Sequence, residues 1–282
     1  MIVDSRAERQ LTGPLKVVAY VSLALTAVAF VNLYLFADHT DDYGPWTITP
    51  PMSAAFLGAG YGAGFVLFLV ALRDHNWARA RIGVITVWFF TVFILVATLM
   101  HNDRFHLTDG PLAARVAGWS WLIVYIAFPA VVAVLIIMQI RSRGGDPPVT
   151  RPMSRLLVVA LAVQGAVLLA TGVALWAVPL RMSDAWPWAL TPLTGRAIGS
   201  WALALGFAAL YAITERDLPR LRPAAITYFV FAVLELSALA RFADDVRWDN
   251  GWTYVYIVVL LSIGALGYYG LSNAAARSAT NL

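Results

Sequence analysis

Long apolar segments separated by short polar stretches make up most of this chain of 282 residues. A helix needs about 20 apolar residues to cross about 30 Å of hydrocarbon. Eight segments qualify, at residues 17–36, 51–72, 82–100, 116–140, 156–178, 197–213, 223–240 and 252–271. This pattern predicts an all-α, polytopic integral membrane protein with eight transmembrane helices. The first segment is too long for the apolar region of a signal peptide, so we expect it to be retained.

The composition agrees with a membrane protein and narrows its chemistry. Hydrophobic residues make up 60% of the chain and charged residues 13%, against about 45–50% and about 25% in soluble domains. The absence of cysteine excludes disulfides, thiolate metal sites and iron–sulfur clusters. Among the 20 basic residues only Lys16 is a lysine, a bias typical of GC-rich bacterial coding. We therefore expect a bacterial cell-membrane protein.

Most of the basic residues fall in loops that an eight-helix topology places on one side of the membrane. They are Arg6, Arg9, Lys16, Arg73, Arg79, Arg81, Arg141, Arg143, Arg151, Arg155, Arg216, Arg220, Arg222 and Arg277. Because basic residues in short loops resist translocation, we expect this side, with both termini, to be cytoplasmic. The net charge of +4 needs only anionic lipid headgroups to balance it, so nucleic-acid binding is not implied.

A six-residue sequence occurs twice, about half a chain apart. Pro45-Trp46-Thr47-Ile48-Thr49-Pro50 returns as Pro187-Trp188-Ala189-Leu190-Thr191-Pro192. Further residues align at a nearly constant offset: Ala71, Arg79, Arg81, Ile85, Thr86, Phe90, Leu95, Ala97 and Gly110 with Ala212, Arg220, Arg222, Ile226, Thr227, Phe231, Leu236, Ala238 and Gly251. The sequence therefore predicts two four-helix repeats at 1–143 and 155–282, joined by a cytoplasmic linker at 144–154. An even number of spans in each makes the repeats parallel.

The repeated motif is typical of a helix start at the outer membrane surface. Thr49 and Thr191 each precede a proline, which suits a helix N-cap followed by proline in the first turn. Trp46 and Trp188 are expected to anchor the motif at headgroup depth. An alternative is that the two helix N-termini attract an extracytoplasmic anion. After the first copy, glycines with GxxxG spacing predict close helix packing, at Gly58, Gly60, Gly62 and Gly64.

Polar residues that could carry chemistry follow the third and seventh predicted helices, at 101–106 and 241–249. The two stretches align but differ in residue type, which suggests that one repeat carries a site that the other lacks. His101, Asp103 and His106 are chemically able to bind a divalent metal, although their spacing is not a recognised metal signature. Haem ligation and polar capping of helix ends are the alternatives.

Glu235 is an acidic residue inside a predicted span. It lies about 8 Å from the outer end of its helix, at 1.5 Å per residue. A buried ionisable group at this depth is costly and is a functional-site hypothesis by default, with a structural hydrogen bond as the alternative. The expected ligand site combines it with residues at the outer surface: Glu235, Arg241, Asp244, His101 and Asn102.

Three function classes remain open on the sequence alone. Nucleotide-binding and hydrolase motifs such as Walker A, HExxH and GxSxG in a strand–helix context are missing. The leading hypothesis is a membrane transport or ligand-binding protein whose polar site opens to the extracytoplasmic side and takes a small solute, ion or lipid. The alternatives are an integral-membrane enzyme that uses the His/Asp cluster on a lipid-borne substrate, and a non-catalytic subunit or assembly factor with a membrane-protein partner or a second copy. No cofactor is identified.

Overall fold

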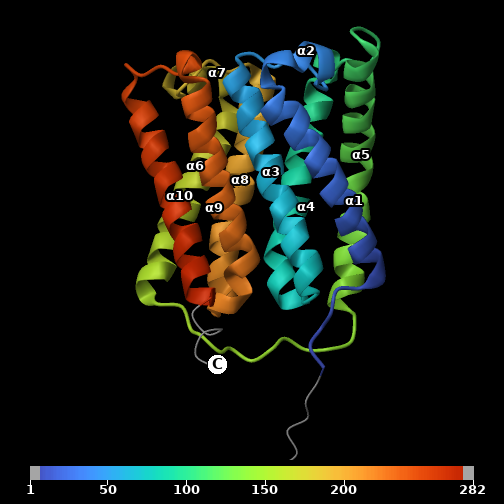
Figure 1. Cartoon of the computed structure of the whole chain (residues 1–282), viewed down its shortest axis with the longest axis vertical. Helices are drawn as coiled ribbons and strands as arrows, with labels where there is room; N and C mark the ends of the chain where they lie inside the picture. Colours follow the sequence, from blue (N-terminus) through green and yellow to red (C-terminus); the bar gives the residue numbers. More distant parts are fainter. Residues whose placement is uncertain (1–6, 276–282) are drawn as a thin grey trace, which may run out of the picture.

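The computed structural model describes residues 7–275 and is all-helical over that range (Figure 1). Eight of its helices are long and apolar enough to cross a membrane, so the prediction of a multi-pass membrane protein is confirmed. These helices are α1 (Gly13–Phe30, extended by the π-helical segment η1, Val31–Leu35), α3 (Pro51–Asp74), α4 (Trp77–Met100), α5 (Leu112–Ile140), α6 (Arg155–Ala177), α8 (Pro192–Glu215), α9 (Leu218–Arg241) and α10 (Gly251–Ala275).

Short helices close one end of the bundle. They are α2 (Thr40–Tyr43), α7 (Pro179–Ala185) and the 3₁₀ turns η2 (Ala37–His39), η3 (Asn102–Arg104) and η4 (Ala243–Asp245). We call this end the α2–α7 face. At the other end, the terminal face, α1 begins, α10 ends and residues 141–154 cross below the helices (Figure 1). Twelve of the fourteen basic residues expected on one side of the membrane lie at the terminal face. The other two, Arg6 and Arg277, lie outside the described residues.

Helices α3 and α8 form the centre of the bundle. Of their membrane spans 72% and 67% are buried, against 22% for α1, α5 and α10. Helix α3 packs on α1 and α9, and α8 packs on α6 and α4. Each central helix therefore contacts an outer helix of its own half and an inner helix of the other half, and these contacts hold the two halves together.

Glycines permit these close approaches; of the set predicted on α3, Gly58 is the one where a Cβ would meet backbone, 2.5 Å from the nitrogen of Tyr34. A Cβ at Gly165 of α6 would lie 3.0 Å from the carbonyl oxygen of Gly206, and one at Gly172 would lie 2.9 Å from that of Gly199. On α3, Gly60 receives the ring of Trp201 from α8, which would lie 2.5 Å from a Cβ at that glycine. Backbone contact of this kind replaces the hydrophobic effect as the driving force for helix association in lipid.

The two halves agree in many local features. Helix α4 begins at Trp77 and α9 at Leu218, and α3 begins at Pro51 and α8 at Pro192, so 141 residues separate each pair, and each of the four helices has 24 residues. The N–H of His106 donates to the carbonyl of Pro45 at 2.9 Å, and the N–H of Arg247 donates to that of Pro187 at 2.7 Å. In both halves, the loop after an inner helix is thus tied to the Pro-Trp motif.

The helix caps at the motif differ between the copies. Thr191 caps α8 as predicted, in a reciprocal capping box with Thr194. The prediction for Thr49 is wrong, because α3 begins one residue later in the motif and places Pro50, which has no side-chain acceptor, at the N-cap. A carboxylate oxygen of Asp245 accepts the N–H of Met52 at 3.0 Å instead. Both N-termini already have internal partners, which argues against the anion site.

The tryptophans of the motif are not headgroup anchors. Trp46 and Trp188 are 3% and 0% exposed, so this prediction is wrong. The ring of Trp46 packs against Phe105 and Trp121, and Trp188 donates from Nε1 to the hydroxyl of Ser53 at 2.9 Å. The loops of the α2–α7 face fold inward over the bundle, so the motif packs against protein rather than lipid.

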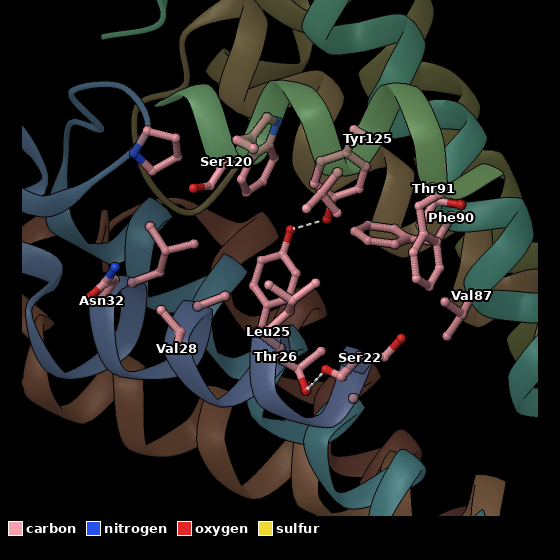
Figure 2. Close-up of a pocket in the computed structure, with 18 of the residues that line it drawn as sticks. Ser22, Leu25, Thr26, Val28, Asn32, Val87, Phe90, Thr91, Ser120 and Tyr125 are labelled. Atoms are coloured by element: carbon pink, nitrogen blue, oxygen red, sulfur yellow. Dashed lines mark hydrogen bonds between the residues drawn. The ribbon is translucent and has the colours of Figure 1, made fainter. Parts of the chain in front are cut away.

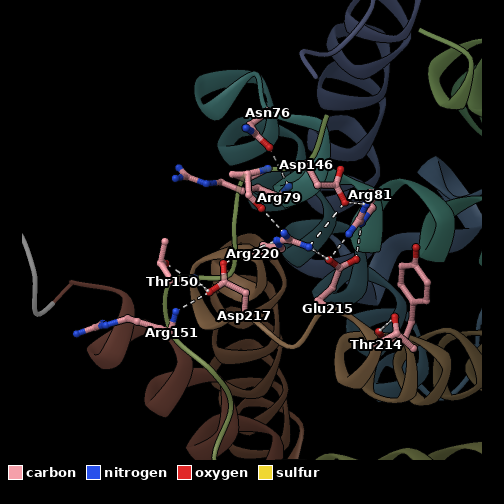
Figure 3. Close-up of polar contacts among 12 residues, drawn as sticks. Asn76, Arg79, Arg81, Asp146, Thr150, Arg151, Thr214, Glu215, Asp217 and Arg220 are labelled. Atoms are coloured by element: carbon pink, nitrogen blue, oxygen red, sulfur yellow. Dashed lines mark hydrogen bonds and ion pairs between the residues drawn. The ribbon is translucent and has the colours of Figure 1, made fainter. Parts of the chain in front are cut away.

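An ion network joins the halves at the terminal face (Figure 3). Arg81 of α4 donates to both carboxylate oxygens of Glu215, at the end of α8, and to Asp146 of the linker. Arg220 of α9 also reaches Glu215, at 3.3 Å. Asp217 accepts the backbone N–H groups of linker residues 150 and 151 at 2.9 and 2.8 Å. The network therefore fixes the linker to both halves.

Replacing Glu215 with glutamine should destabilise the fold by roughly 2–4 kcal/mol, because two guanidinium groups lose a buried counter-charge. The measurement is unfolding of the purified protein in detergent. Asp103→Asn is the matched control, since Asp103 and Arg104 form a pair with side chains that are 67% and 71% exposed. Such a pair contributes little. Equal stability of the two variants would contradict the structural role of the network.

Glycine-to-alanine changes provide a second test of the packing. Gly172→Ala places a methyl group 2.8 Å from the backbone nitrogen of Leu203, so we expect a loss of about 1–3 kcal/mol. Gly64→Ala meets only Thr26 Cγ2, at 3.6 Å, and should be neutral or slightly stabilising because alanine favours helix. Thermal unfolding of both variants distinguishes close packing from a general intolerance of change.

Candidate functional site

Glu235 is fully buried in the second half of the bundle. It lies on α9, six residues before the helix ends at Arg241, and is 0% exposed. The hydroxyl of Tyr256 on α10 donates to Oε2 at 2.8 Å. No described residue forms a hydrogen bond with the other oxygen, Oε1. A buried carboxyl with half of its hydrogen-bonding capacity unused is uncommon, because burial without a partner is costly.

A cavity of about 280 Å³ lies beside this acid. It is lined by α3, α6, α8, α9, α10 and the segment around α7; Tyr256 forms part of its wall, whereas Glu235 itself does not. The lining is mostly aliphatic, and it also includes five aromatic side chains, those of Phe56, Trp186, Phe231, Trp252 and Tyr256. The cavity reaches the molecular surface at Trp252 and Val255, which are 59% and 49% exposed.

Aromatic side chains surround Tyr256 in this wall. The ring of Tyr256 packs edge-on against Trp186 and Trp188, with centroids 5.4 and 5.5 Å away. Ring faces attract cations, and a desolvated carboxylate does so more strongly. No charged side chain is among the described residues that line this cavity, but its wall contacts an acid at Tyr256, whose hydroxyl donates to Glu235.

The first half contains a cavity in the corresponding place (Figure 2). It has a volume of about 170 Å³ and lies between α1, α3, α4 and α5. Pro45 and Phe90 line it, and their aligned partners Pro187 and Phe231 line the other cavity. In place of an acid, this cavity has a hydrogen-bonded pair of buried hydroxyls, those of Tyr61 and Tyr125. The first cavity is therefore neutral.

Arg241 and Asp244 lie near the end of α9 but not at this acid. Arg241 donates to the carbonyl oxygens of Tyr34 and Leu35 at 2.6 and 3.1 Å and to Asp38 at 3.1 Å. It thereby caps the last carbonyls of η1. Asp244 is exposed on η4. Neither side chain forms a hydrogen bond with Glu235 in the described part of the chain.

His101 and Asn102 belong to a different contact. Arg196 of α8 lies with Nη1 2.8 Å from Nε2 of His101. Because a guanidinium can only donate, Nε2 must be unprotonated. Burial and then the charge of Arg196 lower the pKa of His101 below its ordinary value. Asn102 is exposed on η3. The structure thus separates the five predicted ligand residues into a buried acid and several surface contacts.

The predicted metal ligands are also apart. Among the described residues, no group of three or more His, Asp or Glu side chains could hold a metal ion. His106 is buried, with Nδ1 3.1 Å from the carbonyl oxygen of Gly44 and Nε2 3.1 Å from the hydroxyl of Thr47. Both ring nitrogens therefore have protein partners. Asp103 is exposed and pairs with Arg104 at 3.2 Å.

Several residues that shape the cavities carry no signal in a single sequence. Tyr256 is 21 positions from Glu235, and Tyr61 is 64 positions from Tyr125, each pair on different helices. Aromatic residues near span ends are normally interpreted as interfacial. An alignment of many related sequences could have linked such pairs by covariation.

Comparisons with known proteins do not assign this chain to a family. No protein family, no curated protein and no solved structure matches the chain. The class defined by the fold is therefore an integral membrane protein with eight candidate spans.

His101 should make stability depend on pH. As pH falls below about 6.5, the unfolded chain takes up this proton before the folded protein does, so stability is lost on the acid side. We expect the Tm of the wild type to fall more between about pH 7.5 and about pH 5.5 than that of His101→Gln. His39→Gln, a change at an exposed histidine, is the matched control. Identical pH profiles for wild type and His101→Gln would contradict the assignment.

Proposed function

We propose that this protein is a membrane transport or ligand-binding protein in which Glu235 is the ligand- or proton-binding group. The observation that carries this proposal is the fully buried carboxyl with one unpartnered oxygen, joined through Tyr256 to a cavity with five aromatic side chains in its wall. An acid within a span is costly to keep unless it has a function, and it commonly faces a cavity or pathway.

The ligand class follows from the chemistry of the wall. An ionised carboxylate inside the bundle needs a positive partner, which either a proton or the cationic group of a ligand supplies. The aromatic faces of Trp186, Phe231 and Tyr256 favour an organic cation over a strongly hydrated inorganic one. We therefore propose that the ligand is a small lipophilic cation, and that Glu235 holds a proton when the cation is not bound.

The membrane arrangement is part of the proposal. We infer two parallel repeats, with the terminal face in the cytoplasm of a bacterial cell and the α2–α7 face outside. Equal helix offsets, paired contacts of α3 with α9 and α8 with α4, and the basic terminal face support it. Met182, Ala185 and Trp186, in and just after α7, line the cavity, so it lies near the outer face in this arrangement.

Binding of benzyltrimethylammonium to the purified protein tests the site, with neutral neopentylbenzene as a probe of the same shape. The wild type should prefer the cation. Glu235→Gln should weaken cation binding by at least about tenfold, because a buried charge partner is lost, and should leave the neutral probe unaffected. Tyr256→Phe should weaken it by about fivefold, the effect of one hydrogen bond.

Asp244→Asn is the matched control for this experiment. Asp244 is an exposed acid of η4 on the same α2–α7 face, so its removal should leave binding unchanged. Equal affinity of wild type and Glu235→Gln for the cation, or equal loss in Asp244→Asn, would sink the assignment of Glu235. Unfolding measured on each variant separates loss of binding from loss of fold.

A further inference from the structure

The first-half cavity opens sideways at mid-membrane depth. Leu25 and Val28 of α1, which line it, are 37% and 59% exposed. From Gly13 to Leu25 the helix rises about 18 Å at 1.5 Å per residue, close to the middle of a bilayer-spanning helix. Figure 2 shows these side chains of α1 opposite Ser120 and Tyr125 of α5. An occupant would therefore enter from the hydrocarbon rather than from water.

Most polar groups of this cavity already have partners. Ser22 and Thr26 donate to carbonyl oxygens of their own helix at 2.8 and 2.7 Å, and Thr91 donates to Trp88 at 2.9 Å. The indole of Trp121 donates to Thr98 at 3.0 Å. These groups are satisfied without a ligand, so they do not select one.

Two buried donors in the wall have no acceptor among the described residues, in addition to the side chains of Asn32 and Ser120, which line the cavity at less buried positions. In the pair of Tyr61 and Tyr125, one hydroxyl donates to the other, and the second hydroxyl hydrogen has no acceptor among the described residues. Trp201, which also lines the cavity, has a buried Nε1 with no acceptor among them. Both tyrosines are more than nine-tenths buried. A surplus of donors in an apolar site selects a ligand that brings an acceptor.

The shape and charge of the lining narrow the choice further. No charged side chain is among the described residues that line it, and none of these residues hydrogen-bonds to a buried acid as Tyr256 does in the other cavity, which disfavours an ionic ligand. Rings surround the space, at Phe68, Phe90, Trp121, Tyr125, Phe128 and Trp201. Aromatic walls pack best on a flat ring, in stacked or edge-on contact, whereas a flexible acyl chain gains less from them.

We propose that this cavity binds a neutral, lipid-soluble ring compound that carries a carbonyl, of the quinone class. The carbonyl accepts from the tyrosine pair or from Trp201, the ring packs among the aromatic side chains, and an apolar tail leaves between α1 and α5 into the bilayer. The proposal concerns binding alone and is independent of the acid in the other half.

Titration with decylubiquinone, followed by quenching of tryptophan fluorescence, tests this site. We expect saturable binding to the wild type in detergent micelles and a Kd about fivefold higher in Tyr125→Phe, which removes one donor. Gly64→Leu should abolish saturable binding, because Gly64 lines the cavity, a Cβ there has space, and a larger side chain fills it. Tyr256→Phe and Glu235→Gln, in the other half, should bind as the wild type does.

Three results would overturn the proposal. The first is an unchanged Kd in both Tyr125→Phe and Gly64→Leu when thermal unfolding shows both variants to be folded. The second is an equal loss in Tyr256→Phe, which would place the quinone in the other cavity. The third is full displacement by equimolar phosphatidylcholine, which would identify the cavity as a site for ordinary lipid. Failure of the Glu235 experiment leaves these outcomes unaffected.

Discussion

The close approach of α3 and α8 to their neighbours is the constraint on which the rest of the structure depends. In lipid, apolar side chains gain nothing by leaving the solvent, so association requires backbone contact and matched surfaces. Glycine supplies that contact between α6 and α8, where Gly165 and Gly172 face Gly206 and Gly199. Helix α1 has no glycine after Gly13 and meets Gly62 of α3 through the ring of Phe30, whereas its extension η1 brings its backbone against Gly58. The cavity of the first half lies along the contact of α1 with α3.

The Pro-Trp motif joins this packing to the loops. Its proline carbonyls at Pro45 and Pro187 accept the N–H groups of the loops that follow α4 and α9, and its tryptophans fill the space below. Proline has no N–H to satisfy, so a helix can start beside it inside the protein. The motif therefore positions the ends of α4 and α9 at the α2–α7 face. The position of α9 in turn sets the depth at which Glu235 lies.

The sequence predicted features that depend on local pattern, and it missed those that depend on distant partners. Apolar run length located all eight spans, and residue type located the cap at Thr191. The burial of Trp46 was missed because an aromatic residue beside a span looks the same whether it faces lipid or a folded loop. The partner of Glu235 was missed because Tyr256 lies on another helix. Helix α3 begins at Pro51 with Pro50 at the N-cap, and Asp245 rather than Thr49 accepts the N–H of Met52. The sequence alone did not show which of the two prolines opens the helix.

The differences between the halves are informative because their frames agree. Where the backbone is shared, a change of side chain at an aligned position acts on chemistry rather than on architecture. Glu235 aligns with Ile94, so the second cavity has an acid beside it where the first half has an aliphatic side chain. At the same offset Tyr61 aligns with Ala202, so the first cavity has a hydroxyl where the second has a methyl group. The two proposed sites, one for a cation and one for a neutral acceptor, thus differ at these aligned positions, while α3 and α8 contribute side chains to both cavities.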